Sequence, residues 1–132
     1  MDVLRADARV SVSELATRAN VSRANAYQRL GRLTAEGVIR RFTVDVDHRR
    51  LGDAITALIL VDIDQHAWRA VEAEVVALPG VEWVALTTGA FDVAILVRAA
   101  DMETLRDVVL ERLQSMRAVR STQTSFVLEE RS

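Results

Sequence analysis

Residues 13–41, SELATRANVSRANAYQRLGRLTAEGVIRR, contain the pattern that decides the fold of the first part of this chain. Two short helices are predicted, with small or aliphatic residues recurring on one face of each. These residues are Leu15, Ala16 and Ala19 in the first helix and Ala26, Leu30 and Leu33 in the second. Between the helices Asn20 tolerates a left-handed turn, and Ser22 is a favourable N-cap. With Gly37 ending the second helix and a short ribbon expected after it, the segment predicts a winged-type helix-turn-helix.

The outward face of the predicted second helix carries side chains that suit contact with DNA. Asn and Gln pair with adenine, and Arg pairs with guanine or with phosphate. Residues 22–41 include five arginines and one acidic residue. The candidates for reading bases are Arg23, Asn25, Gln28 and Arg32, and those for holding phosphates are Ser22, Arg29, Arg40 and Arg41. The alternative is a solvated face on an ordinary helical hairpin, which the local concentration of positive charge disfavours.

The formal charge divides unevenly along the chain. Residues 1–50 carry ten arginines and six acidic residues, a net charge of +4, whereas residues 51–132 carry seven arginines and thirteen acidic residues, a net charge of −6. A basic first part can approach nucleic-acid phosphates, which an acidic second part avoids. We therefore predict a DNA-binding domain at 1–41, a strand and linker at 42–53, and a further domain at 54–132, with double-stranded DNA as a partner.

Composition disfavours several classes of protein. The 132 residues include no cysteine, which excludes disulfides and the zinc motifs that contain cysteine. His48 and His66 have no partner at ligand spacing, so no metal is expected, and no motif for a cofactor is present. No apolar run reaches the roughly 18 residues that span a membrane, so we expect a cytoplasmic protein with no membrane partner.

The hydrophobic pattern after residue 41 predicts alternating strands and helices. Residues 42–46 alternate as a strand does, and residues 48–53 are expected to be a linker. Further strands are predicted at 55–63, 81–88, 92–98 and 119–128, with helices at 67–78 and 101–116. This β-α-β-β-α-β order is that of the ferredoxin-like fold, so the whole chain is predicted to be of α+β class.

The predicted strands are almost continuously apolar, which is typical of strands buried on both faces. Two helices cover only one face of such a sheet, and the other face of the strand at 55–63 would expose apolar side chains. We expect that face to be covered by a second copy of the chain, most simply in a two-fold dimer.

Taken in order, the motifs resemble the Lrp/AsnC (leucine-responsive, feast-famine) family of transcriptional regulators over essentially the whole chain. Each motif is weak alone, whereas their order and spacing are specific. The matching segments are 7–11 (DARVS), 14–16 (ELA), 29–39 (RLGRLTAEGVI), 78–81 (LPGV), 88–92 (TGAFD) and 127–130 (VLEE). The resemblance implies DNA-binding homodimers that often assemble into octamers, with an amino-acid effector bound where dimers meet through the C-terminal domain.

The resemblance also implies which residues bind the effector. They are Leu86, Thr88, Gly89, Phe91, Asp92, Met102, Ser125, Phe126 and Val127. In such a site Asp92 could accept the ammonium group of a free amino acid, and backbone N–H groups near Gly89 could bind its carboxylate. Leu86, Met102 and Phe126 would form an apolar wall. The alternative is that Gly89 and Asp92 serve only the turn between two strands, since both are ordinary turn residues.

These features predict a sequence-specific DNA-binding transcriptional regulator, modulated by an amino acid or related small ligand at an interface of the C-terminal domain. The sequence leaves two alternatives open. Ferredoxin-like dimers also include small enzymes, although no histidine–nucleophile pair is evident in this chain. A ligand-independent architectural protein would bind DNA with little sequence preference.

Overall fold

The computed structural model describes residues 1–131, the side chain of Val108 apart. The chain divides into two units, Met1–Asp45 and Val46–Ser132. The helices in the described residues are all too short or too polar to cross a membrane.

The N-terminal unit contains α1 (Asp2–Ala6), α2 (Val12–Arg18) and α3 (Arg23–Ala35). Ser11 caps α2 and Ser22 caps α3, because each hydroxyl accepts a hydrogen bond from the backbone N–H three residues later, at 3.1 Å in both cases. Asn20 lies in the turn between these helices with a φ of 56°, the left-handed conformation that was predicted for it. The predicted helix-turn-helix is therefore present.

The core of the N-terminal unit is small. Its buried apolar residues are Leu15, Ala16, Ala26 and Ile39. Leu30 and Leu33, predicted to face inward from α3, are only half-buried. After Gly37, whose φ is 75°, the backbone N–H of Ile39 donates to the Leu33 carbonyl at 3.0 Å. This bond turns the chain back against the end of α3, so that Ile39 completes the core.

Two predictions for residues 37–53 are wrong. No strand forms in residues 37–47, so neither the ribbon after α3 nor the strand at 42–46 is present. A strand needs a hydrogen-bonding partner, and no described strand pairs with this segment. Its alternating apolar side chains, Phe42, Val44 and Val46, are exposed instead. The expected linker contains a short helix, α4 (His48–Leu51), which Asp47 caps by accepting the Arg50 N–H at 3.2 Å.

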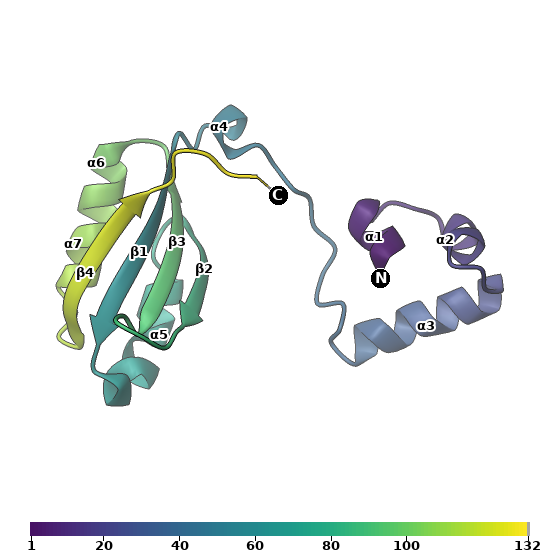
Figure 1. The fold of residues 1–132 in the computed structure, drawn as a ribbon, viewed down its shortest axis with the longest axis horizontal. Coiled ribbons are helices and arrows are strands. Elements are labelled where there is room, and N and C mark those ends of the chain that lie inside the picture. Colours follow the sequence, from purple (N-terminus) through teal and green to yellow (C-terminus); the bar gives the residue numbers. More distant parts are fainter. Residues whose placement is uncertain (132) are drawn as a thin grey trace. The chain divides into compact units, whose positions relative to one another are not determined.

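The C-terminal unit is a four-stranded antiparallel sheet with helices on one face (Figure 1). Its strands are β1 (Ile55–Ile63), β2 (Val81–Leu86), β3 (Val93–Ala99) and β4 (Val119–Phe126), in the order β2-β3-β1-β4. After β1 come η1 (Gln65–Ala67) and α5 (Trp68–Val76). After β3 comes one continuous helix made of α6 (Met102–Thr104), a π-helical stretch η2 (Leu105–Leu110) and α7 (Glu111–Gln114). The predicted ferredoxin-like α+β fold is confirmed.

Strand alternation places one face of the sheet in the core. The largest fully buried side chains include Ile59, Val61, Val93, Ile95 and Val97 from the strands and Val75, Leu105, Val109 and Leu113 from the helices. The other face, called here the open face, carries Leu58 and Leu60 of β1 opposite Leu96 and Ala94 of β3. Trp83 of β2 also pairs with Leu96. An apolar strip therefore crosses the middle of the open face.

The bounds of β1 are those predicted, whereas β2 ends two residues earlier, at Leu86 rather than at residue 88. The reason is a tight turn before β3. The Thr87 hydroxyl donates to the Phe91 carbonyl, and the Thr87 N–H donates to the Asp92 carbonyl, both at 2.8 Å. These bonds close the turn and leave residues 87 and 88 outside the ladder between strands.

Candidate DNA-binding helix and effector site

The side chains predicted to contact DNA lie in α3 or directly after it. Arg23, Asn25, Gln28, Arg29 and Arg32 are exposed on the helix, and Arg40 and Arg41 are exposed beyond its end. The remaining candidate, Ser22, has its hydroxyl engaged as the N-cap of α3. Within residues 1–131 none of these arginines has an acidic group within 4.0 Å, whereas Arg18 pairs with Glu14 at 2.5 Å. The positive charges of α3 are therefore available to phosphates.

Helix geometry separates these side chains into two groups. Successive residues are about 100° apart, so Gln28 lies roughly 160° around the helix from the buried Ala26, and Arg32 lies roughly 120° from it. Both point outward, where bases would be read. Arg23 and Arg29 lie only about 60° from Ala26 and flank the buried side. Arg23, which was predicted to read a base, is therefore better placed to hold a phosphate.

Tyr27 is a candidate that the sequence pattern did not single out. Its side chain is 70% exposed on α3. One turn further along the helix, a Cβ at Gly31 would meet nothing within 4 Å beyond its chain neighbours and the helix's own backbone, so the surface of α3 is open there. An exposed tyrosine offers DNA both an apolar ring face and a hydrogen-bond donor. The signal in the sequence was an aromatic residue out of phase with the apolar stripe of the helix.

The predicted effector-binding residues fall into two groups at opposite ends of the sheet. One group, at the turn between β2 and β3 where β1 ends, is Leu86, Thr88, Gly89, Phe91 and Asp92. The other group, at the start of β1, is Met102, Ser125, Phe126 and Val127. Phe126 pairs with Ala57, whereas Asp92 bonds to Ile63, and the six steps of extended chain from Ala57 to Ile63 span about 20 Å. One protomer therefore does not bring the two groups together.

Both carboxylate oxygens of Asp92 have partners within the C-terminal unit. Oδ2 accepts a hydrogen bond from the Ile63 N–H at 3.1 Å, and Oδ1 accepts one from the side-chain amide of Gln65 at 2.9 Å. The bond from Gln65, followed by the bond from Ile63, holds the pKa of Asp92 below its usual range. Asp92 therefore fixes the turn to the end of β1. Each oxygen keeps a further lone pair that can accept an ammonium group.

Gly89 has a φ of 113°, in the region that favours glycine. No atom lies within 4 Å of where its Cβ would be, so the backbone of this turn is open on that side. The turn thus combines a positioned carboxylate with accessible backbone. A role in the turn and a role in ligand binding are both compatible with this geometry.

Two family models match almost the whole sequence. Residues 56–132 match the Lrp/AsnC ligand binding domain, and residues 1–40 match a winged helix-turn-helix DNA-binding domain. The chain belongs to the Lrp/AsnC family. It is a DNA-binding transcriptional regulator with a ligand-binding domain. The hypothesis of a small ferredoxin-like enzyme is set aside, because the family and the curated relatives are transcriptional regulators.

Relatives of this Lrp/AsnC regulator match it over most of their length. An uncharacterised HTH-type transcriptional regulator of Pyrococcus abyssi is 34% identical, over 95% of this chain and 79% of that protein. Among solved structures, AsnC of E. coli is 25% identical with a TM-score of 0.85, over 98% of this chain and 87% of that one. A Neisseria meningitidis transcriptional regulator in complex with L-Met is 28% identical with a TM-score of 0.87, over 97% of this chain and 84% of that one.

An ion cluster on the open face of this Lrp/AsnC regulator was not predicted. The Arg98 side chain, only 11% exposed, pairs with Glu82 at 2.5 Å and with Glu130, and donates to the Thr56 hydroxyl at 2.9 Å. His48 of α4 lies 4.0 Å from Glu82. The hydrogen bond from Arg98 lowers the pKa of Glu130. The cluster ties α4 and the C-terminal tail to the sheet, and its one signal in the sequence is an arginine within the apolar β3.

Proposed function

We propose that this Lrp/AsnC regulator binds specific sites on double-stranded DNA as a homodimer or a larger homo-oligomer, up to an octamer, and that a free amino acid modulates its assembly. The observation that carries the proposal is the separation of the candidate effector residues at the two ends of each sheet. A site that uses both groups requires two copies of the chain, so ligand binding is coupled to association. Because such a regulator works where the DNA lies, the proposed location is the cytoplasm.

On the DNA side, α3 enters the major groove with its outward face toward the bases. Gln28, Asn25 and Arg32 are the residues that form hydrogen bonds with base edges, and Tyr27 packs beside them. Phosphates are held by the residues nearer the buried side and after the helix, namely Arg23, Arg29, Arg40 and Arg41. Ser22 contributes by capping α3, which fixes where the helix begins.

The open face is the surface through which two copies associate. Trp83 of β2 lies opposite Leu96 of β3, and its side chain is 44% exposed. Leu96 lies opposite Leu58 of β1, so the apolar strip continues across β1. Exposed apolar strips of this kind are covered in stable proteins. A two-fold arrangement would bring the strips of two chains together and bury the indole of Trp83.

The effector is a free amino acid, held between copies. A relative solved in complex with L-Met supports this class of ligand. Asp92 accepts the ammonium group, and the backbone near Gly89 binds the carboxylate. Leu86, Met102 and Phe126 supply the apolar wall for the side chain of the effector. All three are exposed within one protomer, as is expected of residues that a partner copy covers.

Selection of genomic DNA fragments by the full chain, with and without a mixture of the standard amino acids, tests the proposal. We expect bound fragments to share a sequence, and amino acids to change both DNA occupancy and the sedimentation coefficient of the protein. Fragments without a shared sequence would instead support the architectural hypothesis. Unchanged occupancy and sedimentation with every amino acid would refute modulation.

A further inference from the structure

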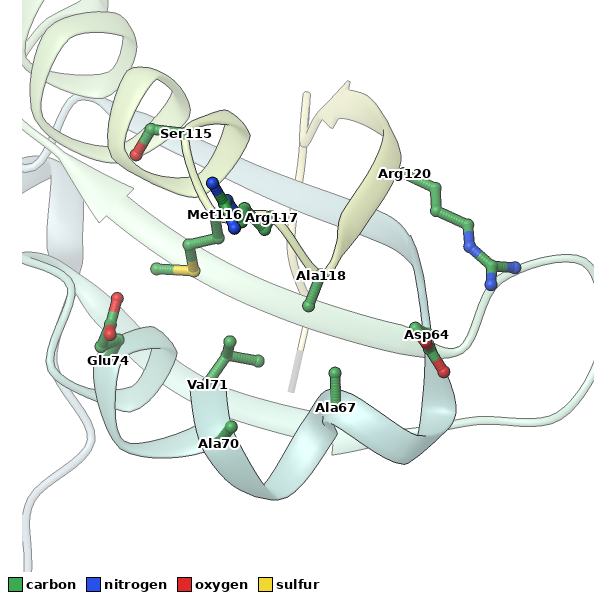
Figure 2. Close-up of a pocket in the computed structure, with 10 residues that line it drawn as sticks. All are labelled: Asp64, Ala67, Ala70, Val71, Glu74, Ser115, Met116, Arg117, Ala118 and Arg120. Carbon is green, nitrogen blue, oxygen red and sulfur yellow. The ribbon is translucent and has the colours of Figure 1, made fainter.

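A groove of about 650 Å³ lies on the helix-covered side of the C-terminal unit. Figure 2 shows α5 along one side of it and the turn between α7 and β4 along the other. All of its lining residues come from one chain, and none belongs to the effector-binding residues discussed above. The groove is therefore a feature of one protomer, unlike a site that needs two copies.

The groove exists because the stripe of α5 that faces it has small side chains. Trp68 and Val75 of α5 are buried in the core, whereas Ala67 and Ala70, on the adjoining stripe, are too short to reach the opposite wall. Across the groove Met116 and Ala118 form the other apolar side. Alanine at these two positions, the end of η1 and the first turn of α5, leaves a hollow with an apolar floor.

The two walls carry opposite charge. Asp64 and Glu74 stand on the side of η1 and α5, and Arg117 and Arg120 stand on the side of the turn and β4. In the described part of the chain no ion pair within 4.0 Å joins these arginines to these acids, so the charges face solvent across the groove. In Figure 2, Asp64 and Arg120 lie toward one end and Glu74 toward the other.

We propose that this groove binds a small zwitterion, a free α-amino acid with an aliphatic side chain, within a single protomer. Arg120 takes the carboxylate, Asp64 at the same end of the groove takes the ammonium group, and the apolar floor takes the side chain. Recognition needs both charges of the ligand, because each wall supplies one sign only. The site is additional to the one proposed between copies and does not depend on it.

The groove is connected to the β2–β3 turn through η1. Asp64 caps η1 by accepting the His66 N–H at 3.1 Å, and Gln65, the next residue, donates to Asp92 at 2.9 Å. Arg120 is also near enough to Asp92 to contribute to the lowering of its pKa. A ligand that draws on Asp64 or Arg120 therefore acts on the residues that position Asp92, so the two sites influence one another.

The three methionines allow both sites to be observed at once. Met116 lines the groove, Met102 belongs to the effector-binding residues, and Met1 serves as a reference. We would label the methionine methyl groups of the full chain with ¹³C, assign them through Met102→Leu and Met116→Leu, and titrate with L-leucine. The expected result is a saturable shift of the Met116 methyl. N-acetyl-L-leucine and L-leucinamide, which each lack one charge, are expected to bind at least about tenfold more weakly.

Variants in α5 separate filling of the groove from a general effect on the helix. Ala70→Leu puts a larger side chain into the groove and should weaken the response of Met116 at least about tenfold. Ala73→Leu, on the same helix but outside the groove, should titrate like the wild type. Arg120→Gln removes the positive charge from an exposed residue, so it tests the proposal even if Ala70→Leu does not fold.

Each outcome decides between the sites. A saturable Met116 shift that Ala70→Leu or Arg120→Gln weakens, and that Asp92→Asn leaves in place, supports the groove. Saturation at Met102 alone supports only the site between copies and overturns the groove. Saturation at Met116 alone supports the groove while the site between copies fails. No saturable shift at Met116, or equal titration by wild type, Ala70→Leu and Arg120→Gln, refutes the groove as a ligand site.

Discussion

The two units of this regulator differ in how much of their side-chain surface they bury. Among the described residues, four apolar side chains are buried in Met1–Asp45, two of them alanines, against fifteen in the C-terminal unit. Stabilisation by burial grows with apolar area, so the ligand-binding unit holds most of the folding free energy. The DNA-binding unit is close to the size at which a single core becomes marginal, and DNA stabilises it by mass action. The ligand-binding unit is therefore expected to be stable by itself, whereas the stability of the DNA-binding unit depends more strongly on bound DNA.

The largest expected effect is on the core of the ligand-binding unit. Ile59→Ala removes a fully buried side chain and should lower the free energy of unfolding by about 2–5 kcal/mol. Both tryptophans, Trp68 and Trp83, lie in this unit, so fluorescence during denaturation follows it alone. Leu30→Ala, in the half-buried face of α3, should leave the fluorescence transition unchanged while reducing helical signal in circular dichroism. One shared transition for both variants would contradict the difference between the units.

The next effect concerns the ligand and not the DNA. Asp92→Asn keeps the shape of the side chain and removes its charge, so amino-acid affinity should fall about tenfold or more, or roughly 1.5–3 kcal/mol. DNA affinity without ligand should stay nearly unchanged, because Asp92 and α3 belong to different units. Calorimetry and a DNA shift assay measure the two quantities. Equal ligand affinity in wild type and variant would reduce Asp92 to a turn residue, and a loss of folding would show that the turn depends on its bonds to Ile63 and Gln65.

Within the DNA-binding unit, loss of a base contact and loss of a phosphate contact should have different effects on DNA affinity. Gln28→Ala should weaken binding to the cognate site by roughly 1–3 kcal/mol and leave random DNA almost unaffected. Arg41→Ala should weaken both alike and reduce the steepness with which log K falls with log salt, by about 0.9 per lost contact. Titrations at several salt concentrations distinguish the two. Identical salt slopes and identical specificity in both variants would count against this division of roles.

The smallest effect is the pH dependence of the ion cluster. Arg98 lowers the pKa of Glu130 in the folded state, so the stabilisation is fully present above the unfolded pKa and is lost as pH falls through the folded pKa. Because Glu130 is half exposed, we expect less than about 1 kcal/mol. Thermal unfolding of wild type and Glu130→Gln should differ near neutral pH and converge in acid. A difference that grows as pH falls would have the wrong sign for this pair.

The sequence was sufficient to predict an element where its local hydrophobic periodicity agrees with the burial that the fold gives it. β1 has the predicted bounds because aliphatic or β-branched residues fill every position of it except Asp62, and the helix-turn-helix follows from Asn20 and Ser22. The strand at 42–46 failed for the opposite reason. Its alternating pattern is strand-like, but the chain provides no partner for its backbone, and pattern alone does not supply one.

The candidate sites show a similar limit. The residues of the proposed effector site came from the resemblance to the family, and their separation follows from antiparallel register, which places Phe126 and Asp92 at opposite ends of β1. The Arg98 cluster and the groove beside α5 join segments that are far apart in sequence. Such features arise from tertiary packing, and short-range patterns do not encode them.

The strandless segment 42–47 between the two units sets a length scale for DNA recognition. Six residues reach at most about 20 Å when fully extended, so in the homodimer proposed above two such segments would add at most roughly 40 Å to the separation of the DNA-binding units. That is close to one turn of B-form DNA, about 34–36 Å. When the two half-sites lie within this distance, binding of the first DNA-binding unit raises the effective concentration of the second unit at its half-site. When they lie further apart, this increase in affinity is lost. For the proposed homodimer we therefore expect operators whose half-sites vary in spacing by up to about one helical turn.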